Sequence, residues 1–460
     1  MTTKKHSVAK RILIFTAICI PATITLLLWW QPTSIARTQD TYKNLEVFAD
    51  VLSIIQKNYV EEIDTQQVIE GAIRGMLATL DPHSSYMKPD DFKELQVETK
   101  GSFSGIGIEI TMKDNILTVV SPIEDTPAFK QGLQAGDKIV KIEDEPTNDM
   151  SLMEAVKRLR GPKGSKVTIS IHREGWTKLK EVTIIRDVIP IHSVRSKTLE
   201  PGYGYARITS FQSKTAKDLK KALEDLADEN KLEGLILDLR NNPGGLLDQA
   251  VQVSDLFINE GVIVSTEGRI KEQNMVFEAH PDKSHHYDFP MVVLVNEGSA
   301  SASEIVAGAL KDHKRALILG AQTFGKGSVQ TIIPMADGAG LRLTTARYFT
   351  PNGTSIQATG ITPDILVPTV LPDADESKEA ETTHKQPKFL REKDLKHHIE
   401  NGNGEDKDAE KEPEEDKDEV TKKAEKAKHK IDEQLQKDRQ LNTALMLLKG
   451  VNVFGNLEKR

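Results

Sequence analysis

The stretch of residues 291–330 constrains the fold of this chain most. An apolar run at 291–295 leads into a cluster of small residues, EGSASASE, at 297–304, and TFGKGSVQ follows at 323–330. Strand and helix patterns alternate here, which predicts an α/β core over residues 187–370. The cluster of hydroxyl groups falls at the start of a helix, and a lysine between two glycines comes after it.

These two segments carry the residue types that acyl transfer needs. A serine hydroxyl is a poor nucleophile until a base removes its proton, and a lysine can be that base only when burial lowers its pKa. Neither segment contains a histidine. We therefore predict Ser301 as the nucleophile and Lys326 as the general base, with Gln330 placed to hydrogen-bond the lysine amine.

The start of a helix also favours a negatively charged oxygen. The free N–H groups and the positive end of the helix dipole both stabilise an oxyanion there, and acyl transfer uses about two such donors. We expect the N–H of Ala302 to be one donor and a backbone N–H of the turn Gly244-Gly245 to be the second.

Residues 41–100 show helical periodicity. A first helix carries an apolar stripe, and a second opens near Asp64 and stops at Asp81-Pro82, where proline ends helices. The first stripe comprises Leu45, Phe48, Leu52, Ile55 and Tyr59. Such stripes favour packing into a core, whereas a first stripe left exposed would instead pair subunits.

Residues 101–186 indicate a β-rich module with one well-capped helix. Glycine punctuates GIGI at 105–108, and the turn GLQAGD at 132–137 leads into a strand. Ser151 and Glu154 make an S-x-x-E capping box that opens a helix. This combination resembles a PDZ domain.

Residues 1–36 predict export from the cytoplasm. Basic residues precede a charge-free run at 12–30 that ends in two tryptophans. About 20 apolar residues span a bilayer, and flanking basic residues stay on the cytoplasmic side. Residues 34–36 also form a passable cleavage site, so an anchored form and a released form both remain open. The one cysteine, Cys19, lies in this run and has no partner for a disulfide within the chain.

The composition changes abruptly after Pro372. Residues 371–425 are predicted to be a charged linker, and residues 426–460 recover partial helical spacing, which indicates a docking helix. This helix either assembles subunits or packs on its own body. Most of the formal net charge of −8 lies in the charged stretch. The nearly neutral body therefore gives no electrostatic case for nucleic acid as a partner.

Three short motifs occur in order along the chain: NNPGG at 241–245, SASAS at 299–303 and FGKGSVQ at 324–330. Together they resemble the carboxyl-terminal processing proteases, also called tail-specific proteases, over about residues 41–370. The resemblance implies an α/β protease core of the crotonase and ClpP spiral type. It also implies an inserted PDZ domain, an N-terminal helical region and a charged C-terminal extension.

The resemblance assigns roles to individual residues. Ser301 matches the family nucleophile, Lys326 its general base and Gln330 the group that orients the lysine. Gly245 and Ala302 match the oxyanion-hole donors. The loop that receives a substrate's terminal carboxylate matches Gly105, Ile106, Gly107 and Ile108. Arg160 matches an arginine that in relatives links the position of the PDZ domain to the state of the protease site.

The implied function is that of an exported serine endopeptidase that binds the C-terminal tails of envelope proteins and cleaves them with a Ser–Lys dyad. It would be periplasmic or otherwise extracytoplasmic, with residues 12–30 as an anchor in the inner membrane. Its implied partners are protein substrates with apolar C-terminal tails, an adaptor lipoprotein as in some relatives, and further copies of itself in a homo-oligomer. No metal or cofactor is implied.

Three other classes fit parts of the sequence less well. GAQTFGK at 320–326 nearly completes a phosphate-binding loop, but Gly327 stands where that motif needs Ser or Thr. A histidine-based hydrolase would need a motif such as G-x-S-x-G, which does not occur, and the histidines of 280–286 fall in a polar loop. A PDZ scaffold that binds tails without cleaving them would not need both Ser301 and Lys326.

Overall fold

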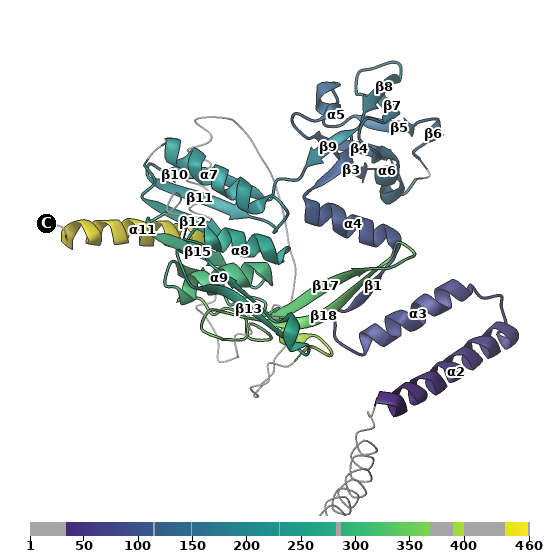
Figure 1. Ribbon diagram of the computed structural model, residues 1–460. Helices are drawn as coiled ribbons and strands as arrows, with labels where there is room; N and C mark the ends of the chain where they lie inside the picture. Colours follow the sequence, from purple (N-terminus) through teal and green to yellow (C-terminus); the bar gives the residue numbers. More distant parts are fainter. Residues whose placement is uncertain are drawn as a thin grey trace, which may run out of the picture. The chain divides into compact units, whose positions relative to one another are not determined.

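The computed structural model describes residues 34–113, 116–148, 150–229, 231–281, 287–368, 390–399 and 438–458. The chain divides into two compact units, Met1–Gly75 and Met76–Arg460 (Figure 1). The predicted membrane segment at 12–30 and most of the predicted linker at 371–425 lie outside the described residues. Among the residues that are described, no helix combines the length and apolar character needed to cross a membrane.

The first unit is helical, as the periodicity of residues 41–100 predicts. Helix α2 covers Ser34–Asn58, and α3, which begins in this unit, covers Thr65–Ala78. Asp64 opens α3, because its Oδ1 accepts two amides of the first turn at 2.9 and 3.3 Å. The second helix thus starts where the sequence indicates.

Three residues of the predicted first stripe are exposed within the described chain, two on α2 and one just beyond its end. Leu45 is 55% exposed, Phe48 44% and Tyr59 60%. Core packing, the interpretation that the stripe favours from sequence alone, is therefore wrong for these three side chains. Pairing of subunits through this face stays a prediction.

The second unit contains the β-rich module. Its sheet has the order β3-β4-β5-β7-β8, with β6 paired to β5. The strands are β3 Ile108–Lys113, β4 Ile116–Pro122, β5 Lys138–Ile142, β6 Glu145–Pro146, β7 Lys166–His172 and β8 Lys180–Ile185. Helices α5 (Pro127–Lys130) and α6 (Leu152–Leu159) complete it. The predicted capping box opens α6, since the amide of Glu154 donates to Ser151 Oγ at 3.3 Å and the amide of Ser151 donates to Glu154 Oε2 at 2.8 Å.

The α/β core is built on a six-stranded sheet in the order β10-β11-β12-β15-β16-β19. Only the β10–β11 pair is antiparallel. The strands are β10 Val194–Glu200, β11 Tyr203–Ile208, β12 Gly234–Asp238, β15 Met291–Val295, β16 Leu317–Gly320 and β19 Ile365–Leu366. Every residue of β12 and β15 is buried, as expected for parallel strands that are covered on both faces.

Helices cover both faces of this sheet. Leu235 and Leu237 of β12 pack in one cluster with α7 (Thr215–Glu229), α8 (Leu247–Asp255) and α9 (Ala302–Asp312). Ile236, which points to the opposite face, packs with α11 (Arg439–Glu458). The alternation of side chains along one strand therefore divides the apolar core into two layers.

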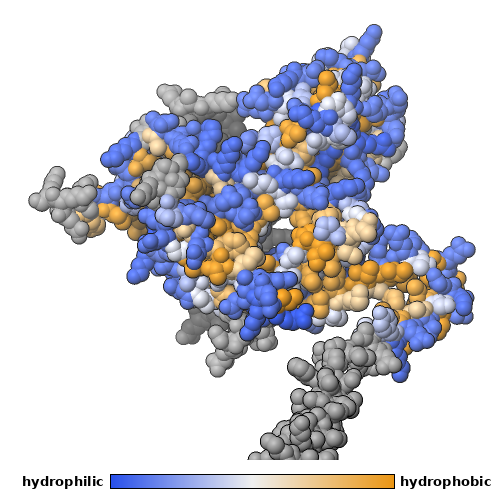
Figure 2. Space-filling view, viewed as in Figure 1, coloured by the Kyte–Doolittle hydropathy of each residue, from blue (hydrophilic) through white to orange (hydrophobic). Residues whose placement is uncertain are grey.

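A second sheet of the core has the order β1-β18-β13-β14, and β17 also pairs with β18. The strands are β1 Ser85–Met87, β13 Val262–Gly268, β14 Met275–Glu278, β17 Ser328–Pro334 and β18 Gly340–Phe349. Figure 2 shows apolar surface over the β17–β18 hairpin, where Ile333 is 39% and Met335 45% exposed. This sheet positions the site, because β17 begins directly after the lysine loop.

One helix and two short strands join the module to the core. Helix α4 (Pro89–Lys100) ends at Gly101, which adopts a left-handed conformation with φ 68°. Strands β2 (Ser102–Gly105) and β9 (Asp187–Pro190) then pair at the entrance and exit of the module.

The C-terminal helix packs on its own body, one of the two outcomes that the sequence leaves open. Leu441, Ala444, Leu445 and Leu448 of α11 are buried against the sheet. Arg240 fixes its start, with its guanidinium bonded to Asp238 at 2.7 Å and to Asp438 at 2.8 Å. Burial alone would lower the pKa of Arg240, but these carboxylates outweigh it and raise that pKa.

Residues 390–399 depart from the expectation of a solvated linker. They contain a 3-10 helix, η2 (Glu392–Asp394), and Glu392 is fully buried. The composition that suggests a linker cannot reveal that one of its carboxylates finds buried partners. The rest of the predicted linker lies outside the described residues.

Candidate active site

Ser301, the predicted nucleophile, stands in the sharp turn between β15 and α9. Its backbone has φ 55° and ψ −112°, a region that non-glycine residues rarely adopt and that strained functional positions often occupy. The turn is fixed around it: Ser299 Oγ donates to the carbonyl of Leu239 at 2.8 Å, and the amide of Ala300 donates to the carbonyl of Asn242 at 3.0 Å. The serine-rich segment is therefore locked to the NNPGG turn.

Gly244 lies against the serine so closely that only glycine fits. A β-carbon at Gly244 would lie 2.9 Å from Ser301 Cβ and 3.0 Å from the amide nitrogen of Ala302. Its φ of 103° also disfavours other residues. The two motifs thus meet in space, as the sequence predicts.

Two backbone amides beside Ser301 have no acceptor among the residues that the structure describes. Gly245 forms a parallel bridge with Phe211, but the bonds of this bridge use the carbonyl of Gly244 and the amide of Leu246. The N–H of Gly245 therefore points away from Phe211 and has no acceptor in the described part of the chain. The amide of Ala302, as the first residue of α9, has no intrahelical acceptor either.

Glu304 joins the serine turn to the lysine loop. Its Oε2 accepts the amides of Ser301 at 2.8 Å and Lys326 at 2.9 Å. Its Oε1 accepts the amide of Gly325 at 2.7 Å and the hydroxyl of Thr323 at 2.5 Å. Glu304 is fully buried, and burial raises its pKa to about 7 against the opposing effect of these four donors. Glu304 was not among the residues predicted for the site, although S-x-x-E at 301–304 has the spacing of a capping box.

Lys326 lies in the loop between β16 and β17. Burial is the largest influence on its amine and lowers the pKa of Lys326, as predicted. Arg342 acts in the same direction, whereas Glu392, Glu304 and Asp81 oppose it. Gly327 cannot be replaced without a clash, because a β-carbon there would lie 2.3 Å from the amide nitrogen of Gln357. The net effect favours the neutral amine that a base requires.

Gln330 lies on β17, two residues beyond the start of the strand. Its Nε2 donates to Ser328 Oγ at 3.1 Å and to Thr344 Oγ1 at 2.9 Å. Its Oε1 is buried and has no partner among the described residues. No hydrogen bond within the described chain joins the amine of Lys326 to Gln330 or to Ser301. A buried acceptor without a donor is unfavourable, so this oxygen is available to a cation.

A second network reaches Gln330 from Asp81, in the segment LDPHS at 80–84. Asp81 Oδ1 accepts the amides of His83 and Ser84, both at 2.8 Å, and the hydroxyl of Thr344 at 3.1 Å. Burial alone would raise the pKa of Asp81, but these bonds and one from Ser84 Oγ lower it. Because Thr344 also accepts the bond from Gln330, the motif LDPHS belongs to the surroundings of the site.

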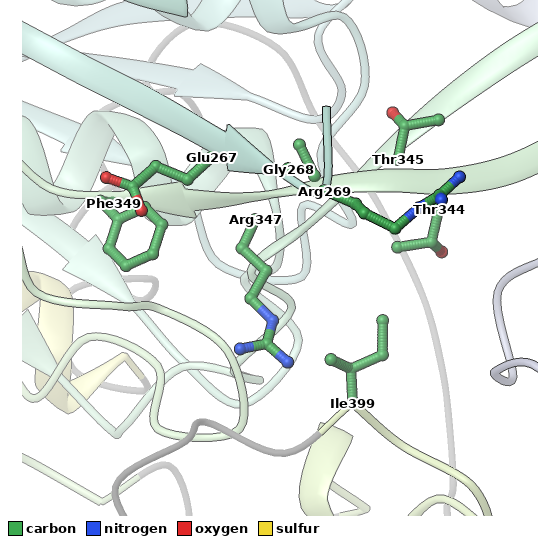
Figure 3. A pocket seen from close by; sticks show the side chains of 9 residues that line it. Glu267, Gly268, Arg269, Thr344, Thr345, Arg347, Phe349 and Ile399 are labelled. Carbon is green, nitrogen blue, oxygen red and sulfur yellow. The ribbon is translucent and has the colours of Figure 1, made fainter. Parts of the chain in front are cut away.

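Thr344 also lines a cavity of about 390 Å³. It lies between the ends of β13 and β18, with Arg347 and Ile399 facing it (Figure 3). Its lining is Glu267, Gly268, Arg269, Thr344, Thr345, Ala346, Arg347, Phe349 and Ile399. No group of three or more His, Cys, Asp or Glu side chains that could hold a metal ion occurs among the described residues.

The predicted tail-binding loop lies between β2 and β3. The carbonyl of Ile106 accepts the amide of Ala128 at 2.8 Å, and that of Gly107 accepts the amide of Ile123 at 3.0 Å. These bonds fix the peptide planes of the loop. Strand β3 is at the edge of its sheet, and Met153 of neighbouring α6 is 74% exposed. An exposed strand edge beside an apolar helix face suits the addition of a peptide strand.

Arg160, at the end of α6, pairs with α4. Its guanidinium bonds both carboxylate oxygens of Glu94, with Nη2 donating to Oε1 at 3.1 Å. It also lies over the ring of Phe103 at 4.9 Å. A second pair, Lys157 with Asp90 at 2.7 Å, joins the same two helices. Arg160 thus contacts the connection between module and core, and not Ser301 or Lys326.

Comparison with known proteins agrees with this geometry. Residues 202–367 match the model of peptidase family S41, residues 104–185 that of the PDZ domain, and residues 31–91 that of the N-terminal domain of the activating protease CtpB. A carboxy-terminal-processing protease of Bartonella bacilliformis is 49% identical over 352 residues, which cover 76% of this chain and 81% of that protein. The carboxy-terminal processing protease CtpB of Bacillus subtilis is 36% identical over 73% of this chain and 70% of its own length. The solved structure of a photosystem II D1 C-terminal processing protease aligns at 32% identity over 70% of this chain and 92% of that chain, with a TM-score of 0.40.

A mixed α/β peptidase core with an inserted PDZ domain defines the class: a serine protease of family S41. Within that class, the chain belongs to the carboxy-terminal processing proteases. The resemblance stated from the sequence is thereby confirmed, as is the fold class.

Proposed function

We propose that this protease cleaves exported proteins through a Ser301–Lys326 dyad after its PDZ domain has bound their C-terminal tails. The observation that carries the proposal is the buried carboxylate of Glu304, which accepts the amides of Ser301 and Lys326 at 2.8 and 2.9 Å. Two segments that bear the reacting groups are thus held by one oxygen. These two hydrogen bonds support the proposal that Ser301 and Lys326 act in one active site.

The reaction follows from these positions. Neutral Lys326 takes the proton of Ser301, whose oxygen attacks the peptide carbonyl. The oxyanion accepts hydrogen bonds from the amides of Gly245 and Ala302. Lys326 then protonates the leaving amine, and water hydrolyses the acyl-enzyme. Gln330 orients the lysine by offering its unpaired Oε1 to the ammonium form. No step needs a metal or cofactor.

Substrate capture is assigned to the PDZ loop. The amides of Gly105, Ile106, Gly107 and Ile108 receive the terminal carboxylate, and the tail adds a strand to the edge of β3. The exposed apolar face of α6 favours apolar tails. Arg160 relays the position of the module through Glu94 of α4.

The remaining parts of the proposal concern location and partners. Residues 12–30 anchor the enzyme in the inner membrane or are removed with the leader, which places it in the periplasm or another extracytoplasmic space. Envelope proteins are then its substrates, with an adaptor lipoprotein delivering some of them. The exposed stripe of α2 supports a homo-oligomer.

The test compares the full-length protein with Ser301→Ala and Lys326→Ala on fluorescein-labelled casein, in the presence of a chelator. Ser265→Ala on β13 and Lys271→Ala on the surface are matched controls, because neither lies in the site. We expect cleavage to persist with chelator and in both controls and to vanish in both site variants. Full cleavage by Lys326→Ala would refute the dyad.

A binding measurement tests tail capture separately. Peptides that end in apolar residues should bind Ser301→Ala protein with a free C-terminal carboxylate and lose affinity when that carboxylate is amidated. Equal affinity for the two forms would contradict the role of residues 105–108.

A further inference from the structure

Residues 390–399 lie on the loop that carries Lys326. Arg391 Nη1 donates to Gln322 Oε1 at 3.2 Å. The amide of Glu392 donates to the carbonyl of Phe324 at 3.2 Å. A segment far along the chain thus contacts the lysine loop at two points just before Lys326.

The side chain of Glu392 adds a third contact. It is fully buried. Its Oε1 accepts Nε2 of Gln357 at 2.9 Å, and Oε1 of Gln357 accepts the amide of Gly327 at 3.0 Å. Both oxygens of Glu392 also lie 2.7 Å from Nε2 of His83. The residue that follows Lys326 is therefore connected through Gln357 and Glu392 to the LDPHS motif.

The lysine loop is consequently held from two sides. Glu304 holds the amides of Gly325 and Lys326 from the side of α9. The backbone amide of Glu392 donates to the carbonyl of Phe324, and its carboxylate holds the amide of Gly327 through Gln357. Three consecutive peptide groups around the base, 324–325, 325–326 and 326–327, are thus fixed by the carboxylate of Glu304, by the backbone of Glu392 and by the carboxylate of Glu392 through Gln357.

Glu392 also acts electrostatically on the base. After burial, it is the strongest influence on the amine of Lys326, and it opposes the effect of burial on the pKa of that amine. The other charged groups that act on Lys326 are Arg342 of β18, Glu304 of α9 and Asp81 before β1, and His83 stands next to Glu392. The carboxylate of Glu392 favours the charged form of the amine and so limits how far the pKa of Lys326 falls.

We propose that Glu392 is a positioning residue of the protease site, whose side chain holds the Lys326 loop in reach of Ser301 through Gln357. Residues 390–399 are then a working part of the enzyme and no linker. The same segment places Ile399 at the cavity that Thr344 lines (Figure 3). This inference rests on the proposed dyad.

The experiment uses full-length protein and the casein assay, with three variants of one short helix. Glu392→Ala removes the contact to Gln357, and kcat should fall on the order of 100-fold with KM little changed, as for a misplaced catalytic group. Glu392→Gln keeps an oxygen for Gln357 but loses the charge. It should restore most of kcat at alkaline pH and move the rising limb of the pH profile to lower pH, because the opposing charge on Lys326 is gone. Asp394→Asn, which removes an exposed charge from the same helix, should match the wild type in both respects.

A second readout does not depend on activity. Hydrogen exchange of the peptide that covers residues 322–330 should be faster in Glu392→Ala than in the wild type, because the amide of Gly327 loses its fixed acceptor. If Glu392→Ala fails to fold, the pH profile of Glu392→Gln decides the question alone.

The outcomes separate two failures. If Ser301→Ala and Lys326→Ala still cleave, the dyad itself is wrong. If these are inactive while Glu392→Ala keeps wild-type kcat, or the pH profile of Glu392→Gln superimposes on that of the wild type, the positioning role is overturned and the dyad stands. An equal shift in Asp394→Asn would likewise overturn it, since the effect would be one of general charge.

Discussion

Replacing Gly244 by alanine tests whether the turn beside Ser301 shapes the oxyanion site. The added β-carbon would lie 2.9 Å from Ser301 Cβ, 2.9 Å from the carbonyl oxygen of Ala300 and 3.0 Å from the amide nitrogen of Ala302. Ordinary contacts between such atoms need about 3.5 Å or more. Ser301 and Ala302 must therefore move by roughly 0.5 Å in relation to the turn, since two of the neighbours are backbone atoms and the third is a Cβ, which no side-chain rotation can move.

The expected loss in kcat is on the order of 100-fold, the effect of removing one oxyanion donor or misplacing a reacting group. Stability falls as well. Alanine at the φ of 103° costs about 1–2 kcal/mol, and the overpacking adds about 1–3 kcal/mol. Gly175→Ala is the matched control, because its φ is 85° but its added β-carbon meets no atom within 4 Å. It should lose only the backbone part of the stability and keep its activity.

The assay measures kcat and KM on labelled casein, with Ser301→Ala as the background, and Tm by calorimetry. Gly244→Ala should be nearly inactive at a temperature where it is still folded, whereas Gly175→Ala should cleave like the wild type. Equal kcat values for the two variants would refute the argument that Gly244 is required by its closeness to Ser301 and Ala302.

Three further predictions follow from the buried charges. Burial raises the pKa of Glu304 from 4.5 to about 7, so its contribution to the free energy of unfolding is fully present below about pH 4.5 and is lost as the pH rises through 7. Glu304→Gln cannot titrate and should remove a pH dependence on the order of 3 kcal/mol, measured by urea unfolding at several pH values. Identical pH dependence in both proteins would contradict this. Because the pKa of Lys326 is lowered, kcat/KM should rise with pH through a pKa below the ordinary 10.5, and a profile without such a limb would exclude Lys326 as the base. Arg240→Ala leaves the buried carboxylate of Asp238 without its ion pair and should lower the free energy of unfolding by about 3–5 kcal/mol, with an unchanged value showing that α11 is held by its apolar face alone.

Local patterns in the sequence were sufficient for many parts of this fold. The apolar run of β15 is buried throughout, and Ser151 with Glu154 caps α6 as the spacing requires. The glycine pair at 244–245 and the small residues at 299–303 predicted the two turns. These signals are readable because each depends on residues within one turn or one strand.

Residues that act across long separations were not predictable in the same way. Glu392 lies in a stretch whose composition resembles a linker, and nothing near it in sequence shows that His83 and Gln357 surround it. The LDPHS motif gave no sign of its bond to Thr344, which lies on a strand of the core. Burial of α2 was expected from its stripe, yet a stripe records only that a face is apolar and not what covers it.

The sequence by itself determined the class of chemistry, because the residue types and their order, a serine at a predicted helix start and a lysine between glycines, are fixed by the chain before it folds. Only the tertiary structure decided how these groups are held. Glu304 bonds the lysine loop directly and Glu392 does so through Gln357. Burial, which depends on every packed neighbour, lowers the pKa of Lys326. Hydrogen bonds and desolvation act over a few ångströms in space whatever the distance along the chain, so no local pattern contains them.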